Sequence, residues 1–186
     1  DCSLKKLDSL TYSRDSRSAP LLVSLATADG KTLVLDPENF GSLAEELAGA
    51  EIVHHNASFD ETYLQMKARS NELPGFTPAR VYCSADLASY LQYPRTLAGA
   101  CNAELKASEF WDDFKDYAGR DSELALKLFN ELESQWPDHE RRLSEHTRLM
   151  LHRGIGIDRS ALDESIEMAQ NAVVDSEKRI PWCASG

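Results

Sequence analysis

The chain has 186 residues, and its 20 lysines and arginines against 31 aspartates and glutamates give a formal net charge of −11 at pH 7. This length suits one domain of ordinary size with the start of a second. A composition of 42% hydrophobic and 27% charged residues is typical of a globular chain rather than a disordered one. The acidic balance argues against a protein that holds nucleic acid by bulk positive charge. It leaves open an enzyme that approaches a few phosphates through metal ions.

Two further patterns argue against a membrane protein and against a zinc-binding protein. No uncharged apolar run approaches the ~18 residues that a membrane span needs, and no secretory leader is visible. The four cysteines are scattered and lack the paired spacing of a zinc site. We therefore expect a cytoplasmic domain with free thiols and no membrane partner.

The first fifty residues predict a hairpin followed by a helix. Residues 1–20 are polar and predict an irregular segment. Two apolar runs, 21–26 and 32–35, flank an Asp-Gly dipeptide, which is a strong signal for a β-hairpin. Apolar residues at helical spacing then predict a helix over 40–47.

The middle of the chain alternates predicted strands and helices. A short strand over 51–55 leads into a helix over 59–66, and a second strand over 81–83 leads into helices over 85–91 and 97–105. A strand that feeds a helix is typical of a mixed α/β domain.

The last third is expected to be helical. A long helix is predicted from Tyr117 to Trp136, with Leu124, Leu128 and Leu132 as its buried stripe, and Pro137 ends it. A further helix follows over 139–151, and Ser160 is predicted to cap the N-terminus of a last one. We interpret 1–136 as one domain and 137–186 as a separate helical segment.

A cluster of polar residues follows the predicted strand at 51–55. Asn56 turns the chain, Phe59 anchors the turn, and Asp60 falls in the first turn of the next helix. Ligands of α/β folds bind beyond the carboxyl ends of strands, and a carboxylate there can hold a hard cation such as Mg²⁺. Taken alone, Asp60 is more simply explained as an acid stabilised by the helix dipole.

A second pair of polar residues opens the long helix. Tyr117 and Asp121 are four residues apart and therefore share one helix face. A phenol hydroxyl beside a metal-binding carboxylate can orient the water that attacks a substrate. Taken alone, the pair is more simply explained as a tyrosine at the edge of the core and an exposed aspartate.

Together these two stretches resemble a known family. Asn-x-x-Phe-Asp at 56–60 and Tyr-x-x-x-Asp at 117–121 resemble the second and third motifs of DEDD-type 3′→5′ exonucleases, in the subgroup that uses tyrosine. The elements between them are similar in order to the proofreading domains of family A DNA polymerases. Residues 152–158 resemble the segment that joins the proofreading and polymerase domains in phage-type enzymes. The resemblance covers roughly residues 4–180.

The resemblance implies a fold and an activity. The fold is a ribonuclease H-like exonuclease fold, with a mixed sheet of about five strands flanked by helices, in the size range common for sheets. It would occupy 1–136, without its first strand, and be followed by a helical segment over 137–186 that leads into a polymerase domain. The activity is proofreading removal of nucleotides from a single-stranded DNA 3′ end or primer terminus. The setting would be the cytoplasm of a bacterium or phage-infected host.

The resemblance also implies roles for four residues. Asp60 and Asp121 would be catalytic carboxylates that bind two divalent metal ions, Mg²⁺ or Mn²⁺, with Asp121 on the ion that carries the attacking hydroxide. Tyr117 would orient that water, and Asn56 would steady the site or the terminal nucleotide. Two cations would also reverse the negative field of the domain locally.

The first motif of the family, Asp-x-Glu, is not intact. Two explanations remain open. The motif lies upstream of this sequence, because residues 4–6 resemble the segment that follows it in phage-type polymerases. Alternatively, Asp1-Cys2-Ser3 is a degenerate copy, with serine in place of glutamate. On either explanation this chain can lack a complete metal site.

Two other functions fit parts of the pattern. A ribonuclease D-like 3′ RNA exonuclease shares both motifs, but it would need a contact to the 2′-hydroxyl that the sequence does not reveal. A catalytically inactive exonuclease-fold module that braces a polymerase or binds DNA would explain the degenerate first motif. Divalent-metal binding distinguishes this module from an active enzyme.

Overall fold

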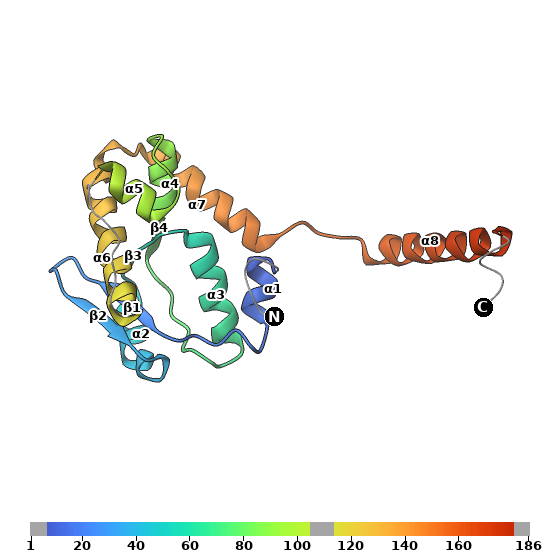
Figure 1. Cartoon of the computed structure of the whole chain (residues 1–186), viewed down its shortest axis with the longest axis horizontal. Coiled ribbons are helices and arrows are strands. Elements are labelled where there is room, and N and C mark those ends of the chain that lie inside the picture. Colours follow the sequence, from blue (N-terminus) through green and yellow to red (C-terminus); the bar gives the residue numbers. More distant parts are fainter. Residues whose placement is uncertain (1–6, 105–113, 181–186) are drawn as a thin grey trace. The chain divides into compact units, whose positions relative to one another are not determined.

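The computed structural model describes residues 7–104 and 114–180, and it is a mixture of helices and short strands (Figure 1). The described chain divides into two compact units, Asp1–His152 and Arg153–Gly186. The division falls between His152 and Arg153, beyond Pro137. The helices are α1 (Ser9–Arg14), α2 (Phe40–Leu47), α3 (Ala57–Arg69), α4 (Ser84–Tyr90), α5 (Leu97–Glu104), α6 (Phe114–Leu132), α7 (Asp138–Arg153) and α8 (Arg159–Arg179).

The first described element is a helix that the sequence did not predict. Residues 1–20 were expected to be irregular, but 9–14 form α1. The side chain of Asp8 accepts hydrogen bonds from the backbone N–H groups of Leu10 and Thr11, both at 3.0 Å. These bonds satisfy two of the donors that a helix N-terminus leaves unpaired. α1 packs against α3, where the ring of Tyr12 lies 6.1 Å from that of Phe59.

The predicted hairpin is confirmed. β1 (Val23–Ala26) pairs antiparallel with β2 (Thr32–Leu35), with Val23 opposite Leu35. Gly30 lies in the turn with φ of +85°, a left-handed conformation that glycine adopts without steric cost. The turn chemistry therefore fixes the register of the two strands.

The second pair of strands is parallel. β3 (Glu51–His54) pairs with β4 (Arg80–Cys83), with Glu51 opposite Arg80 and His54 opposite Cys83. Helix α3 lies in the crossover between them, as parallel pairing requires. Within the described residues the four strands form two separate two-stranded sheets, and the expected sheet of five strands is not shown.

Helix α6 provides much of the core of the first unit. It packs against the hairpin, β3, α4 and α5. Its predicted buried stripe is confirmed, because Leu124, Leu128 and Leu132 are almost fully buried beside Trp136. Each such side chain contributes roughly 1.5–3 kcal/mol by leaving water. Gly119 lets the hairpin approach, since a Cβ there would lie 3.1 Å from Cγ2 of Val34.

One buried arginine connects helix α7 to the rest of the first unit. The guanidinium of Arg148, only 5% exposed, donates to Glu61 Oε2 at 3.0 Å, to Ser144 Oγ at 2.7 Å and to the Val81 carbonyl at 2.7 Å. Asp86 lies 3.7 Å away as a second counter-charge. These contacts explain why the first unit continues past Pro137.

The second unit contains α8. Its N-terminal cap is Asp158, whose side chain accepts from the backbone N–H of Ala161 at 3.1 Å. The prediction of Ser160 as the cap was therefore wrong by two residues. An aspartate that precedes a helix satisfies the same unpaired donors. Within the described residues, no helix is both long enough and apolar enough to cross a membrane.

Candidate functional site

The chain turns at Asn56 between β3 and α3, as predicted. Asn56 precedes α3 with φ of 70° and ψ of 51°, a left-handed conformation in which asparagine is enriched. The Phe59 backbone N–H donates to the Asn56 carbonyl at 2.9 Å and closes the first turn. Asp60 therefore lies in the first turn of α3, as predicted, and Asn56 is exposed beside it.

The carboxyl group of Asp60 lies in an environment that disfavours its charge. Burial, and after it the negative charge of Glu61, raise the pKa of Asp60 to about 7. About a third of the side chain, 34%, remains accessible, so the group is buried from most directions and open from one. A carboxyl group with a raised pKa and an open side is a candidate functional group.

The side chain of His54 lies beside the carboxyl group of Asp60. Its Nδ1 lies 3.6 Å from Oδ2 of Asp60, which is too long for a hydrogen bond. Burial, and after it the positive charge of Arg148, lower the pKa of His54 to about 4. Both shifts favour the uncharged forms. The contact is therefore one between two neutral groups at pH 5 to 6, not an ion pair.

The other two predicted site residues lie together on α6. Tyr117, 37% exposed, and Asp121, half-buried, are one turn apart on the same helix face, as predicted. Next to Asp121, the hydroxyl of Ser122 bonds that of Ser24 at 2.7 Å, and Thr32 Oγ1 donates to Glu123 at 2.6 Å. These bonds to the hairpin fix the rotation of α6 at Asp121.

The residues fit a metal site only in part. Carboxylate oxygens suit Mg²⁺, and Asp60 and Asp121 supply such oxygens. Across 7–104 and 114–180, however, no three His, Cys, Asp or Glu side chains gather as a metal-binding group. The described contacts of Asp60 do not include Tyr117 or Asp121. Asp1, Cys2 and Ser3 lie outside the described residues.

His55 has a role that sequence reasoning missed. His54 and His55 are both half-buried. The two ring nitrogens of His55 contact Ser84 Oγ at 3.0 Å and the Arg95 carbonyl at 2.9 Å. The ring therefore ties the end of β3 to the start of α4 and to the loop before α5. No local pattern signals such a contact, because its partners are distant in the sequence.

Comparison with known proteins identifies no family for this chain. No protein-family model matches the sequence, and no curated protein matches it. Inference about function therefore depends on the residues described above.

Proposed function

We propose that this chain is a 3′→5′ exonuclease domain that proofreads for a family A, phage-like DNA polymerase. The observation that carries the proposal is the geometry around Asp60. This carboxyl group follows the carboxyl end of a parallel strand, in the first turn of a helix, and has a pKa raised to about 7. The helix face that carries Tyr117 and Asp121 supports the proposal independently.

Each residue has a proposed role in the reaction. Asp60 and Asp121 bind divalent cations, Tyr117 orients the attacking water, and Asn56 steadies the terminal nucleotide. Bound Mg²⁺ or Mn²⁺ supplies an activated water and stabilises charge on the attacking and leaving oxygens. The substrate is a single-stranded DNA 3′ end or primer terminus, and the product is a 5′-monophosphate.

The finer features of the fold are part of the same proposal. The two small sheets are parts of a ribonuclease H-like mixed sheet of about five strands. The helical segment after Pro137 leads into a polymerase domain of the same parent chain. The α/β character and the absence of a membrane-spanning helix from the described residues are consistent with a cytoplasmic polymerase.

Digestion of a 3′-labelled single-stranded DNA oligonucleotide with Mn²⁺ tests the proposal. Wild-type chain is compared with Asp60→Asn, Asp121→Asn and Tyr117→Phe. Asp116→Asn serves as the matched control, because Asp116 is an exposed acid on the same helix. We expect release of the label by the wild type and the control, and loss of release with the two site aspartate variants. Equal release by all variants would refute the proposed roles.

If the folded chain is inactive, the next experiment extends it at its N-terminus. Adding the residues that precede Asp1 in the parent protein restores activity if the first motif lies upstream. Continued inactivity of the extended chain would favour an inactive exonuclease-fold module. The absence of a three-ligand group from the described residues is the observation that favours this second candidate. Such a module would bind DNA or brace a polymerase without binding Mn²⁺.

A further inference from the structure

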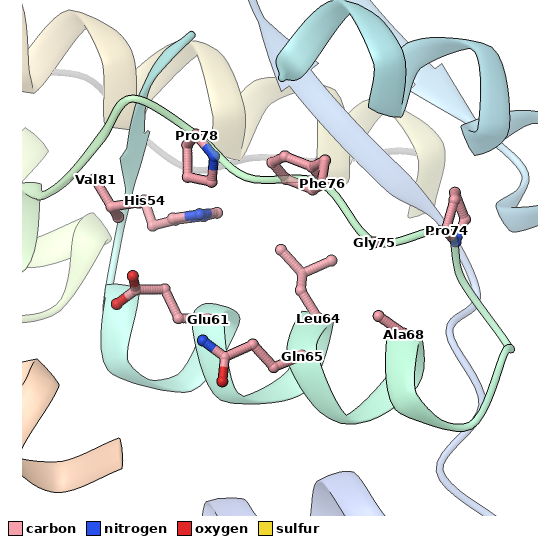
Figure 2. Close-up of a pocket in the computed structure, with 10 residues that line it drawn as sticks. All are labelled: His54, Glu61, Leu64, Gln65, Ala68, Pro74, Gly75, Phe76, Pro78 and Val81. Atoms are coloured by element: carbon pink, nitrogen blue, oxygen red, sulfur yellow. The ribbon is translucent and has the colours of Figure 1, made fainter. Parts of the chain in front are cut away.

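A small cavity lies between α3 and the extended segment 74–78 that leads to β4 (Figure 2). Its volume is about 120 Å³. An apolar cavity of roughly 150 Å³ is known to hold a benzene-sized ring. Because this cavity is open on one side, a single ring can enter it and carry a substituent that projects outward.

The walls of the cavity are mainly apolar, and its polar groups are concentrated toward one end. Leu64 and Ala68 of α3 face Phe76 and Gly75 of the extended segment across the gap, and Pro78 lies nearer to His54 (Figure 2). The imidazole of His54 projects into the cavity at the end nearest β3, where Glu61 also lies. Two flat apolar walls with polar groups at one end fit a planar ring with a polar edge.

Glu61 and His54 each have a polar atom with no described hydrogen-bond partner, and the exposed side chain of Gln65 also lines the cavity. Glu61 uses Oε2 to accept from Arg148 at 3.0 Å, and its Oε1 has no hydrogen-bond partner among the described residues. His54 has Nδ1 beside Asp60, and no described residue bonds its Nε2. A ligand can therefore donate to Glu61 and exchange a second hydrogen bond with the imidazole, which can donate or accept at Nε2.

The charges near the cavity favour a neutral ligand. Arg148 lies against Glu61 and already balances its negative charge. A cationic ligand would therefore gain little from Glu61 and would be repelled by the guanidinium. An amino group on an aromatic ring donates hydrogen bonds without carrying a charge.

From these observations we infer that the cavity binds a neutral aminopyrimidine ring, the chemistry of the cytosine base. The amino group donates to Glu61 Oε1, and the adjacent ring nitrogen accepts from His54 Nε2. Uracil presents a carbonyl oxygen and a ring N–H at the same positions. It would therefore place an acceptor against the Glu61 carboxylate. This inference does not depend on nuclease activity.

The test is an NMR titration of the full chain with cytosine, and uracil serves as the matched ligand. A ring of this size with two hydrogen bonds is expected to bind with a Kd of about 1 mM. The imidazole resonances of His54 should shift and saturate with cytosine. Uracil should bind at least about fivefold more weakly.

A cavity-filling variant locates the ligand. In Ala68→Leu the larger side chain extends into the cavity, and leucine keeps the helix favourable. The control is Ala169→Leu, the same change at an exposed position of α8. Gly75→Ala is a second, milder filling variant, because its Cβ would meet Ala68 Cβ at an ordinary 3.5 Å. Thermal unfolding checks that each variant is folded.

The three variants have different expected effects on cytosine binding. We expect binding at least about tenfold weaker in Ala68→Leu, weaker binding in Gly75→Ala, and no change in Ala169→Leu. Titration with short oligodeoxycytidine and oligothymidine then distinguishes a base within a strand from a free base. The inference is overturned if cytosine produces no saturable shift up to about 20 mM. It is also overturned if uracil binds equally or if a folded Ala68→Leu variant binds as the wild type does.

Discussion

Nδ1 of His54 lies 3.6 Å from Oδ2 of Asp60, and both side chains favour their uncharged forms. The pKa shift of each residue has a cause other than its partner in this pair. Burial and Glu61 raise the pKa of Asp60 to about 7, whereas burial and Arg148 lower that of His54 to about 4. The two groups therefore have opposite effects on stability within the same pH range.

Removing Asp60 should reveal the effect of His54. In Asp60→Asn, the folded state still resists protonation of His54, whose ordinary pKa is 6.5. The unfolded state binds more protons, so the free energy of unfolding should rise by about 1 kcal/mol as the pH rises from about 4 to 6.5. Urea unfolding of the metal-free chain at three pH values in this range measures the slope. A flat profile would contradict the lowered pKa of His54.

Removing His54 should reveal the opposite slope. In His54→Gln, Asp60 keeps a pKa raised from 3.8 to about 7, so the folded state binds more protons than the unfolded state. The contribution to stability is complete below the ordinary pKa and is lost as the pH rises through about 7. The free energy of unfolding should fall by about 1 kcal/mol across this range. Stability that rises with pH in this variant would show that Asp60 has an ordinary pKa.

Arg148 should contribute strongly to stability. Arg148→Met removes three hydrogen bonds and leaves Glu61 without its buried counter-charge, whereas Asp86 keeps Arg95 at 2.7 Å. We expect a loss of about 3–5 kcal/mol in the free energy of unfolding, because breaking a buried ion pair leaves an uncompensated charge. Arg142→Met on the same helix is the control, since Arg142 is exposed and should change stability by less than about 0.5 kcal/mol. Equal losses in chemical denaturation would refute the role of Arg148 in fastening α7.

Gly119 tests the approach of the hairpin to α6. A Cβ there would lie 3.1 Å from Val34 Cγ2 and 3.3 Å from Thr32 Cγ2, so Gly119→Val forces the strands or the helix to shift. We expect a loss of about 1–3 kcal/mol. Gly41→Val in α2 is the matched control, because a Cβ at Gly41 would meet no atom within 4 Å. Thermal unfolding compares the two variants. Similar melting temperatures would show that the hairpin does not pack tightly on α6.

Local sequence signals predicted much of the fold, and long-range contacts account for most of what they missed. The Asp-Gly turn and the leucine stripe of α6 are patterns within a few residues of one another, and both predictions were confirmed. The packing of α1 could not be predicted because Tyr12 contacts Phe59 of α3, far away in the sequence, whereas the Asp8 cap is a local signal that was overlooked. The fastening of α7 by Arg148 was missed because its partners lie far away in the sequence.

Some features of the candidate site also follow from local sequence signals, and others depend on long-range packing. The positions of Asp60 in a first turn and of Tyr117 and Asp121 on one helix follow from motif spacing, and the structure confirms them. The raised pKa of Asp60 and its contact with His54 follow from burial and packing, which no local pattern specifies. The proposed metal ligands and the catalytic roles remain predictions.

The most direct test is a titration of the chain with Mn²⁺ at pH 7.5, followed by electron paramagnetic resonance. The account predicts binding that weakens at least about tenfold in Asp60→Asn and in Asp121→Asn, with Asp116→Asn unchanged. It also predicts weaker binding below pH 7, because Mn²⁺ must displace the proton of Asp60. Binding by the wild type that neither substitution weakens would contradict the assignment of Asp60 and Asp121 as metal ligands.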